Sequence, residues 1–174
     1  MKYADGPTAE VEVEVDAPPE RVWPFVIDID LPGRFSSEFQ GAEWRTGADA
    51  GPALGATFEG RNHHPARGEW RTTSTIVAFE PQRCFGWAVS DTANPSAEWR
   101  FTLEPAGDGG RTILRQWGRM GPGPSGLTPA IQAMPDKEER IVARRLEEWR
   151  TNMQATVEGI KALAEAARPP AERQ

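Results

Sequence analysis

The sequence lacks the residues that most metal and disulfide frameworks need. Cys84 is the only cysteine among 174 residues, which excludes an intramolecular disulfide. The two histidines, His63 and His64, are adjacent, and no second cluster of cysteine and histidine exists to complete a zinc site. Neighbouring residues of a strand also point to opposite faces, so the pair cannot share one ion within a strand. We expect no metal.

Long apolar runs are also missing. Nowhere do about 18 apolar residues follow one another, so no segment is predicted to span a membrane. The N-terminus has no apolar stretch of signal-peptide length, and with the single cysteine this predicts a cytoplasmic protein. The net charge of -6 argues against a nucleic-acid partner, because affinity for phosphate depends mainly on Lys and Arg. The sequence does not indicate an oligomeric state.

What remains is typical of a folded domain. Hydrophobic residues make up 38% of the chain and include seven Trp and seven Phe, which excludes intrinsic disorder. The 17 glycines and 16 prolines predict many turns. At this length we expect a single domain over residues 1–174, with an ordered core from about 9 to 167 and frayed termini.

Periodicity predicts seven strands and two short helical segments before residue 121. Apolar and acidic residues alternate from Glu10 to Asp16, as in a half-buried strand. Prolines followed by Glu20 predict a short helix over 18–27, and a helical turn is expected near 31–35. Aromatic and β-branched stretches separated by turn residues predict six further antiparallel strands. They fall near residues 40–45, 56–62, 68–79, 83–90, 97–104 and 112–120.

The last third of the sequence predicts a loop and then a long helix. Four prolines and three glycines make 121–135 a loop of unusual length. From Asp136 to Arg168 apolar residues recur at spacings of three and four, which predicts one amphipathic helix. Arg144 and Arg145 with Glu148 are expected to be ordinary ion pairs on its outer face. The apolar stripe comprises Val142, Leu146, Trp149, Met153, Thr156, Ile160, Leu163 and Ala167.

This order of elements predicts an α+β fold in which a curved sheet of seven antiparallel strands grips the last helix, because two flat layers cannot accommodate it. Five runs of sequence resemble the polyketide cyclase/dehydrase branch of the START-like, or SRPBCC, superfamily. They are Ala17-Pro-Pro-Glu-Arg-Val-Trp23, Asp28-Ile-Asp-Leu-Pro-Gly-Arg-Phe-Ser36, Glu38-Phe-Gln-Gly-Ala-Glu-Trp44, Phe58-Glu-Gly-Arg-Asn62 and Trp99-Arg-Phe101. The resemblance covers about residues 9–166 and implies a helix-grip fold with a deep apolar cavity. It does not fix a ligand.

Strand alternation predicts which side chains face that cavity. Residues that flank charged positions are assigned inward, because Arg and Glu rarely lie buried. The predicted lining is mainly aromatic and aliphatic, with a few neutral polar groups, which is typical of a small-molecule pocket. A solid core is the alternative, but its polar residues would each need a buried partner. The predicted ligand-binding residues are Phe58, Asn62, Trp70, Thr72, Ser74, Ile76, Phe85, Trp87, Trp99, Phe101, Leu114, Gln116, Met120, Met153, Thr156 and Ile160.

Two functions follow from this set. The first is binding of a small hydrophobic molecule, such as a polyketide-like aromatic, an isoprenoid or a lipid. The second is a cyclase or dehydratase acting on such a molecule without a metal or organic cofactor. The predicted lining contains no ionisable residue, which favours binding, and His63 and His64 are the only weak catalytic candidates. The apolar residues Leu127, Ile131 and Met134 in the 121–135 loop are predicted to gate the cavity, with a passive linker as the alternative.

Overall fold

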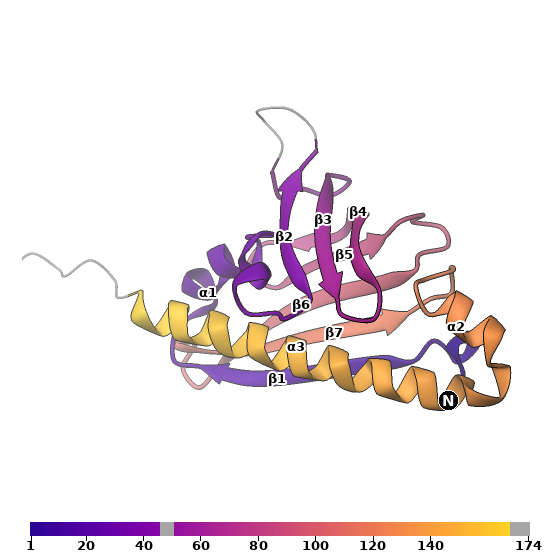
Figure 1. The fold of residues 1–174 in the computed structure, drawn as a ribbon. Helices are drawn as coiled ribbons and strands as arrows, with labels where there is room; N and C mark the ends of the chain where they lie inside the picture. The colour runs from indigo at the N-terminus through magenta and orange to yellow at the C-terminus, as the bar shows by residue number, and fades with distance from the viewer. Residues whose placement is uncertain (46–50, 168–174) are drawn as a thin grey trace, which may run out of the picture.

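One antiparallel sheet curves around a long helix in the computed structural model, which describes residues 1–45 and 51–167 (Figure 1). The seven strands of this described part have the order β1-β7-β6-β5-β4-β3-β2. They are β1 (Thr8–Val15), β2 (Phe39–Trp44), β3 (Thr57–His64), β4 (Gly68–Glu80), β5 (Cys84–Val89), β6 (Ala97–Ala106) and β7 (Arg111–Met120). The α-helices are α1 (Pro19–Val26), α2 (Thr128–Ala133) and α3 (Glu138–Ala166), and short 3-10 turns are η1 (Tyr3–Asp5), η2 (Leu31–Arg34) and η3 (Pro135–Lys137).

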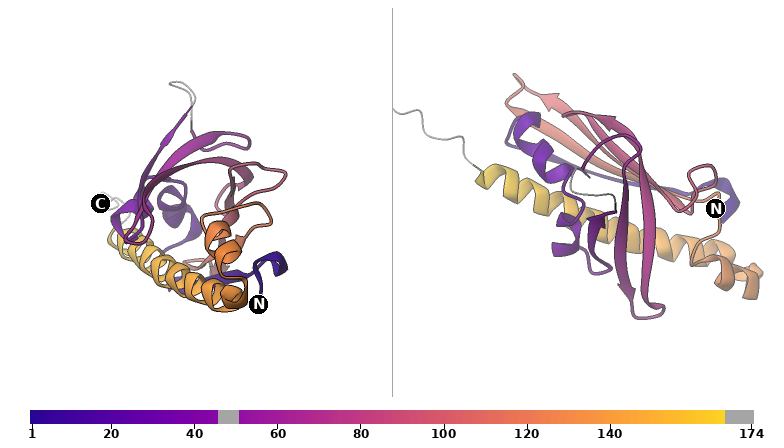
Figure 2. Two further views of the ribbon diagram at one scale, coloured as in Figure 1. Left: turned by 45° about the vertical axis from the view of Figure 1, so that its right-hand side comes forward. Right: turned by 90° about the horizontal axis from the view of Figure 1, so that it is seen from above.

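The predicted α+β helix-grip architecture is confirmed. Each expected strand is present with ends within about two residues of the prediction, and α1 and η2 follow β1 as the two short helical segments. Figure 2 shows the concave face of the sheet wrapped over α3. The predicted end of the last helix at Arg168, and the expected frayed tail after it, lie outside the described residues.

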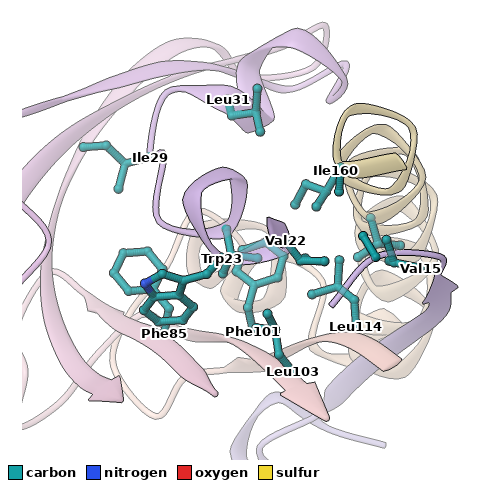
Figure 3. Close-up of a cluster of buried hydrophobic side chains, with 14 of the residues drawn as sticks. Val15, Val22, Trp23, Ile29, Leu31, Phe85, Phe101, Leu103, Leu114 and Ile160 are labelled. Atoms are coloured by element: carbon teal, nitrogen blue, oxygen red, sulfur yellow. The ribbon is translucent and has the colours of Figure 1, made fainter. Parts of the chain in front are cut away.

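A hydrophobic core fills the space between the sheet and α3 at the end of the concave face where α1 lies. Along β1 every second residue faces inward, and β1 pairs with β7 so that Val13 lies opposite Leu114. Leu114, Val15 and Ile160 of α3 are almost completely buried in one cluster, where Figure 3 shows them together. Trp23 of α1 packs its ring against Phe85, with centroids 6.4 Å apart. Helix α1 therefore closes this end of the concave face.

The N-terminus differs from the prediction of a frayed end. Tyr3 lies in η1, and its backbone N–H donates to Glu138 at 3.0 Å. Its hydroxyl donates to the carbonyl oxygen of Gly123 at 2.6 Å. These bonds dock the first residues against the segment before α2 and the start of α3, so the expectation was wrong at this end.

The predicted 121–135 loop is also only partly a loop. Residues Thr128–Ala133 form α2, and η3 follows directly. Proline misled the prediction here, because Pro129 occupies the first turn of α2, where a missing N–H costs nothing. Ser125 orders the approach to α2: its backbone N–H donates to Thr128 Oγ1 at 2.9 Å, and its hydroxyl accepts from Leu127 N at 3.2 Å.

Candidate functional site

A cavity of about 330 Å³ lies between the concave face of the sheet and α3. Its walls come from β2 to β7, from the middle of α3, from the chain between α1 and β2, and from residues 124–127. This volume is at the lower end of the usual range for small-molecule sites. The sequence-predicted residues that line the cavity are Phe58, Asn62, Trp70, Thr72, Ser74, Phe85, Trp87, Trp99, Phe101, Gln116, Met120, Met153 and Thr156.

Three residues predicted for the lining lie in the hydrophobic core instead. Ile76, Leu114 and Ile160 are almost completely buried in the cluster around α1. Each lies on the same face as a lining residue, two residues away in a strand or four in the helix: Ile76 is near Ser74, Leu114 near Gln116, and Ile160 near Thr156. Alternation predicted the correct face for all three, but α1 packs against α3, β6 and β7 and fills that end of the face.

Two of the three predicted gate residues also lie away from the cavity. Leu127 lines it together with Pro124, Ser125 and Gly126. Ile131 and Met134 do not, and Ile131 packs instead against the buried cluster that contains Val142 and Leu146 of α3. Met134 is 39% exposed.

The apolar walls are built of aromatic rings. Trp87 lies 5.7 Å from Phe58 and 6.1 Å from Phe101, measured between ring centroids. Trp149 of α3 packs on Trp99 at 4.3 Å, so this buried residue, assigned to the core stripe in sequence, also lines the cavity. Gly118 makes this pair possible, because a Cβ there would lie 2.7 Å from the Trp99 ring.

Ionisable residues line the cavity as well, which corrects the prediction that the inward set has none. They are Asp28, Glu38, Arg67 and Arg145. All four come from turns, loops or α3 rather than from the inward positions of strands, so strand alternation did not apply to them.

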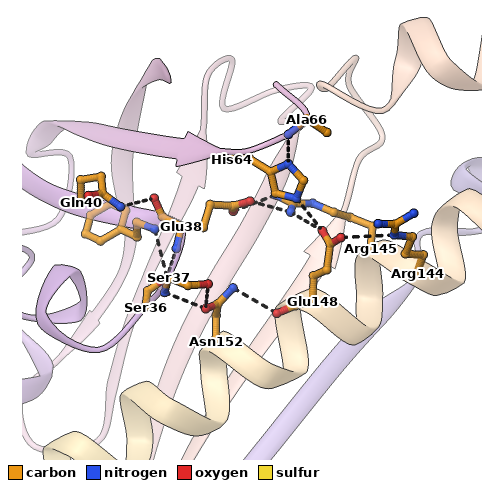
Figure 4. Close-up of polar contacts among 11 residues, drawn as sticks. Ser36, Ser37, Glu38, Gln40, His64, Ala66, Arg144, Arg145, Glu148 and Asn152 are labelled. Atoms are coloured by element: carbon orange, nitrogen blue, oxygen red, sulfur yellow. Dashed lines mark hydrogen bonds and ion pairs between the residues drawn. The ribbon is translucent and has the colours of Figure 1, made fainter. Parts of the chain in front are cut away.

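Arg145 forms an ion pair that joins α3 to the start of β2. Its guanidinium donates to both oxygens of Glu38, at 2.6 and 2.8 Å, and to Glu148 at 2.9 Å (Figure 4). The Arg145 and Glu38 side chains are only 12% and 16% exposed. Burial acts to lower the pKa of Arg145, but Glu38 and Glu148 outweigh it and raise the pKa. Arg145 is therefore not the ordinary surface partner that the sequence predicted.

A signal for this ion pair was present in the sequence. Arg145, Glu148 and Asn152 recur at spacings of three and four, each directly before a member of the apolar stripe. Such a polar stripe borders the buried face of a helix. Asn152 uses this place to accept hydrogen bonds from the backbone and hydroxyl of Ser37, at 2.9 and 3.0 Å.

The histidine pair lies beside a separate, smaller pocket, which includes Glu148. His64 Nδ1 accepts from the backbone N–H of Ala66 at 3.0 Å, and its Nε2 is 3.4 Å from Glu148 (Figure 4). His63 is exposed. The structure thus places both weak catalytic candidates outside the main cavity.

Arg67 differs from Arg145 in having no ion pair with any residue that the structure describes. It lies in the turn between β3 and β4, with its guanidinium carbon 4.1 Å from the centre of the Trp70 ring. Within residues 1–45 and 51–167, no carboxylate lies within ion-pairing distance of it. Partial burial lowers the pKa of Arg67, and the charge of Arg145 lowers it further, against the opposing effect of Glu38.

The described part of the chain contains neither a cluster of metal ligands nor a helix that could span a membrane. Between residues 1 and 45 and between 51 and 167, no three His, Cys, Asp or Glu side chains are grouped so as to hold a metal ion. None of the helices in those ranges combines the length and the apolarity needed to cross a bilayer.

Solved structures share this architecture. The Polyketide_cyc-like protein Cgl2372 from Corynebacterium glutamicum is 29% identical over 96% of this chain and 97% of its own, with a TM-score of 0.61. The Zhui aromatase/cyclase from Streptomyces sp. R1128 is 16% identical over 95% and 98%, with a TM-score of 0.65. Ara h 8.0201 is 16% identical over 92% and 98%, with a TM-score of 0.57. The last two likenesses concern the fold alone.

Among curated proteins, none matches the chain. The model of one family, described as polyketide cyclase/dehydrase and lipid transport, matches residues 7–165. This match extends over all seven strands and nearly all of α3. The chain therefore belongs to the polyketide cyclase/dehydrase and lipid transport family.

Proposed function

We propose that the protein binds a small, mainly apolar molecule, such as a polyketide-like aromatic, an isoprenoid or a lipid, in the cavity between the sheet and α3. The observation that carries this proposal is the lining of aromatic rings around about 330 Å³, which also includes neutral polar side chains such as Asn62, Thr72 and Gln116. Aromatic walls provide affinity, and sparse polar groups orient a ligand. Membership of a family that includes lipid transport supports the same function.

A cyclase or dehydratase activity is the second candidate, and the ionisable residues of the lining favour it. An aldol cyclisation needs a base for an α-proton and donors for the enolate. Arg67 is a suitable donor, but the two carboxylates are engaged: Glu38 accepts from Arg145, and Asp28 Oδ1 accepts from the Asp30 backbone N–H at 3.1 Å. Binding therefore remains the better-supported function.

Tryptophan fluorescence tests the binding function. We expect a neutral apolar dye, Nile red, to bind the native protein saturably and to quench tryptophan emission, because Trp70, Trp87 and Trp99 line the cavity. Trp87→Phe should remove part of the quenching. Trp117→Phe is the matched control, since Trp117 lies on the opposite face of β7 against Arg100. Failure of the dye to saturate, or equal quenching in both variants, would refute the cavity as a binding site.

We also propose that residues 121–127 gate the cavity. Gly123 fixes this segment, because its N–H donates to Pro95 at 2.8 Å and its carbonyl accepts from the Tyr3 hydroxyl. Leu127, Ser125 and Gly126 then extend over the cavity.

Removing one of these bonds should loosen the gate. Tyr3→Phe deletes the hydroxyl and keeps the ring, so we expect dye dissociation to become several-fold faster, while the free energy of unfolding falls by about 1 kcal/mol. Stopped-flow fluorescence measures the rates. Thr151→Val is a control that deletes an exposed hydroxyl on α3. Equal dissociation rates in wild type and Tyr3→Phe would show that the segment is a passive connection.

A further inference from the structure

One buried polar atom in the cavity lacks a partner. Gln116 is 7% exposed, and its Oε1 accepts no hydrogen bond from any residue in the described ranges. Its side chain lines the cavity directly beside Leu114, where the core begins, so it marks the inner end. An unsatisfied buried acceptor is costly unless a ligand or water donates to it. A ligand hydroxyl fits this place, because it can donate to Oε1 and accept from Nε2 of the same amide.

Arg67, which has no carboxylate within ion-pairing distance among residues 1–45 and 51–167, lines the same cavity. The Arg67 guanidinium stacks on Trp70 and occupies the space above Gly126, where a Cβ would lie 1.7 Å from Nη2. Its neighbour Arg145 is already bound to Glu38 and Glu148. Arg67 is thus the cation of the lining that is available for a ligand anion.

Resting on the binding function proposed above, we propose that the ligand is a hydroxylated aromatic acid whose hydroxyl bonds to Gln116 and whose free carboxylate pairs with Arg67. The aromatic walls around Trp87 and Trp99 hold the ring system between these two ends. A carboxylate matches the single guanidinium fork, which donates two parallel hydrogen bonds. A phosphate would bring a second charge, and Arg145 is not free to neutralise it.

Three naphthalene probes test this proposal, each measured by displacement of Nile red at neutral pH. They are 6-hydroxy-2-naphthoic acid, its methyl ester, and 2-naphthoic acid. The acid is expected to bind about tenfold more tightly than the ester, because only the acid carries a charge for Arg67. The hydroxylated acid is expected to bind severalfold more tightly than 2-naphthoic acid, because only the former reaches Gln116 as a donor.

Variants assign each preference to its residue. Arg67→Gln should abolish the preference for acid over ester and keep the hydroxyl preference. Gln116→Leu should do the reverse, and it should fold, because it replaces an unpaired buried amide by an apolar group of similar size. Arg100→Gln is the matched control: Arg100 also lies over a tryptophan, Trp117, but on the outer face of the sheet.

Gly126→Ala separates a local contact from overall charge. It keeps every charge but displaces the Arg67 guanidinium, so the acid preference should fall as in Arg67→Gln. A wild-type protein that does not distinguish acid from ester, or variants that leave both preferences intact, would overturn the proposal while Nile red binding stands. Absence of Nile red binding would instead overturn the binding function, and this proposal with it.

Discussion

Arg145→Met is expected to lower the free energy of unfolding by about 3 kcal/mol, because it leaves two partly buried carboxylates without their cation. Glu38 would lose both of its charge-assisted hydrogen bonds, and Glu148 would lose one. Urea denaturation followed by circular dichroism measures the loss. Arg150→Met is the matched control, since Arg150 pairs with Glu147 at 3.4 Å on the exposed face of α3. The control should change stability by less than about 0.5 kcal/mol.

The same cluster predicts a loss of stability in acid. Partial burial acts to raise the pKa of Glu148, but Arg145 and then His64 outweigh it and hold the pKa below its ordinary value. A depressed pKa stabilises the folded state at every pH above the pKa that Glu148 has in the unfolded chain, which is about 4.3. This contribution disappears as the pH falls through the lower pKa of Glu148 in the folded state. The difference in stability between wild type and Glu148→Gln should therefore shrink from pH 6 to pH 3. A difference that stays constant over this range, or an Arg145→Met variant as stable as its control, would contradict the role of the cluster.

The sequence was sufficient to predict the strands and the faces of their side chains. Alternation around Arg100 correctly placed Trp99 and Phe101 inward, and the stripe on the last helix correctly placed Met153 and Thr156. These are local properties, since side-chain direction in a strand or helix follows from its own period. The same local rule succeeded for the neutral polar residue Gln116.

The limits of the cavity depend on distant contacts and could not be predicted in this way. Ile76 obeys the same alternation as Ser74, but it joins the buried cluster that also contains Val22 and Trp23 of α1. Arg67 and Glu38 lie outside any periodic element that would indicate their direction. They reach the cavity because the twisted sheet brings the β3–β4 turn and the start of β2 to α3. Sheet curvature accumulates over seven strands, and no single segment of sequence encodes it.

Gly159→Leu is expected to destabilise the protein by about 3 kcal/mol, although leucine is a far better helix former than glycine. Gly159 lies within α3, directly beneath the ring of Phe35 at the end of η2. A Cβ on Gly159 would lie 2.6 Å from three atoms of that ring. A planar aromatic ring cannot yield locally, so Phe35 and the chain before β2 must move away from α3. Thermal and urea denaturation measure the effect.

Gly159→Ala gives the sharper test, because two effects predict opposite signs. At an unconstrained helix position alanine stabilises by about 1 kcal/mol over glycine, whereas the clash with Phe35 predicts a loss of about 1–2 kcal/mol. In a Phe35→Ala background the clash is gone, so the same substitution should become stabilising. A stabilising Gly159→Ala in the wild-type background would mean that Phe35 does not pack on the helix backbone. The sign reversal would instead show that Gly159 lets η2 approach α3 closely, and the Asp28–Ser36 wall of the cavity depends on that approach.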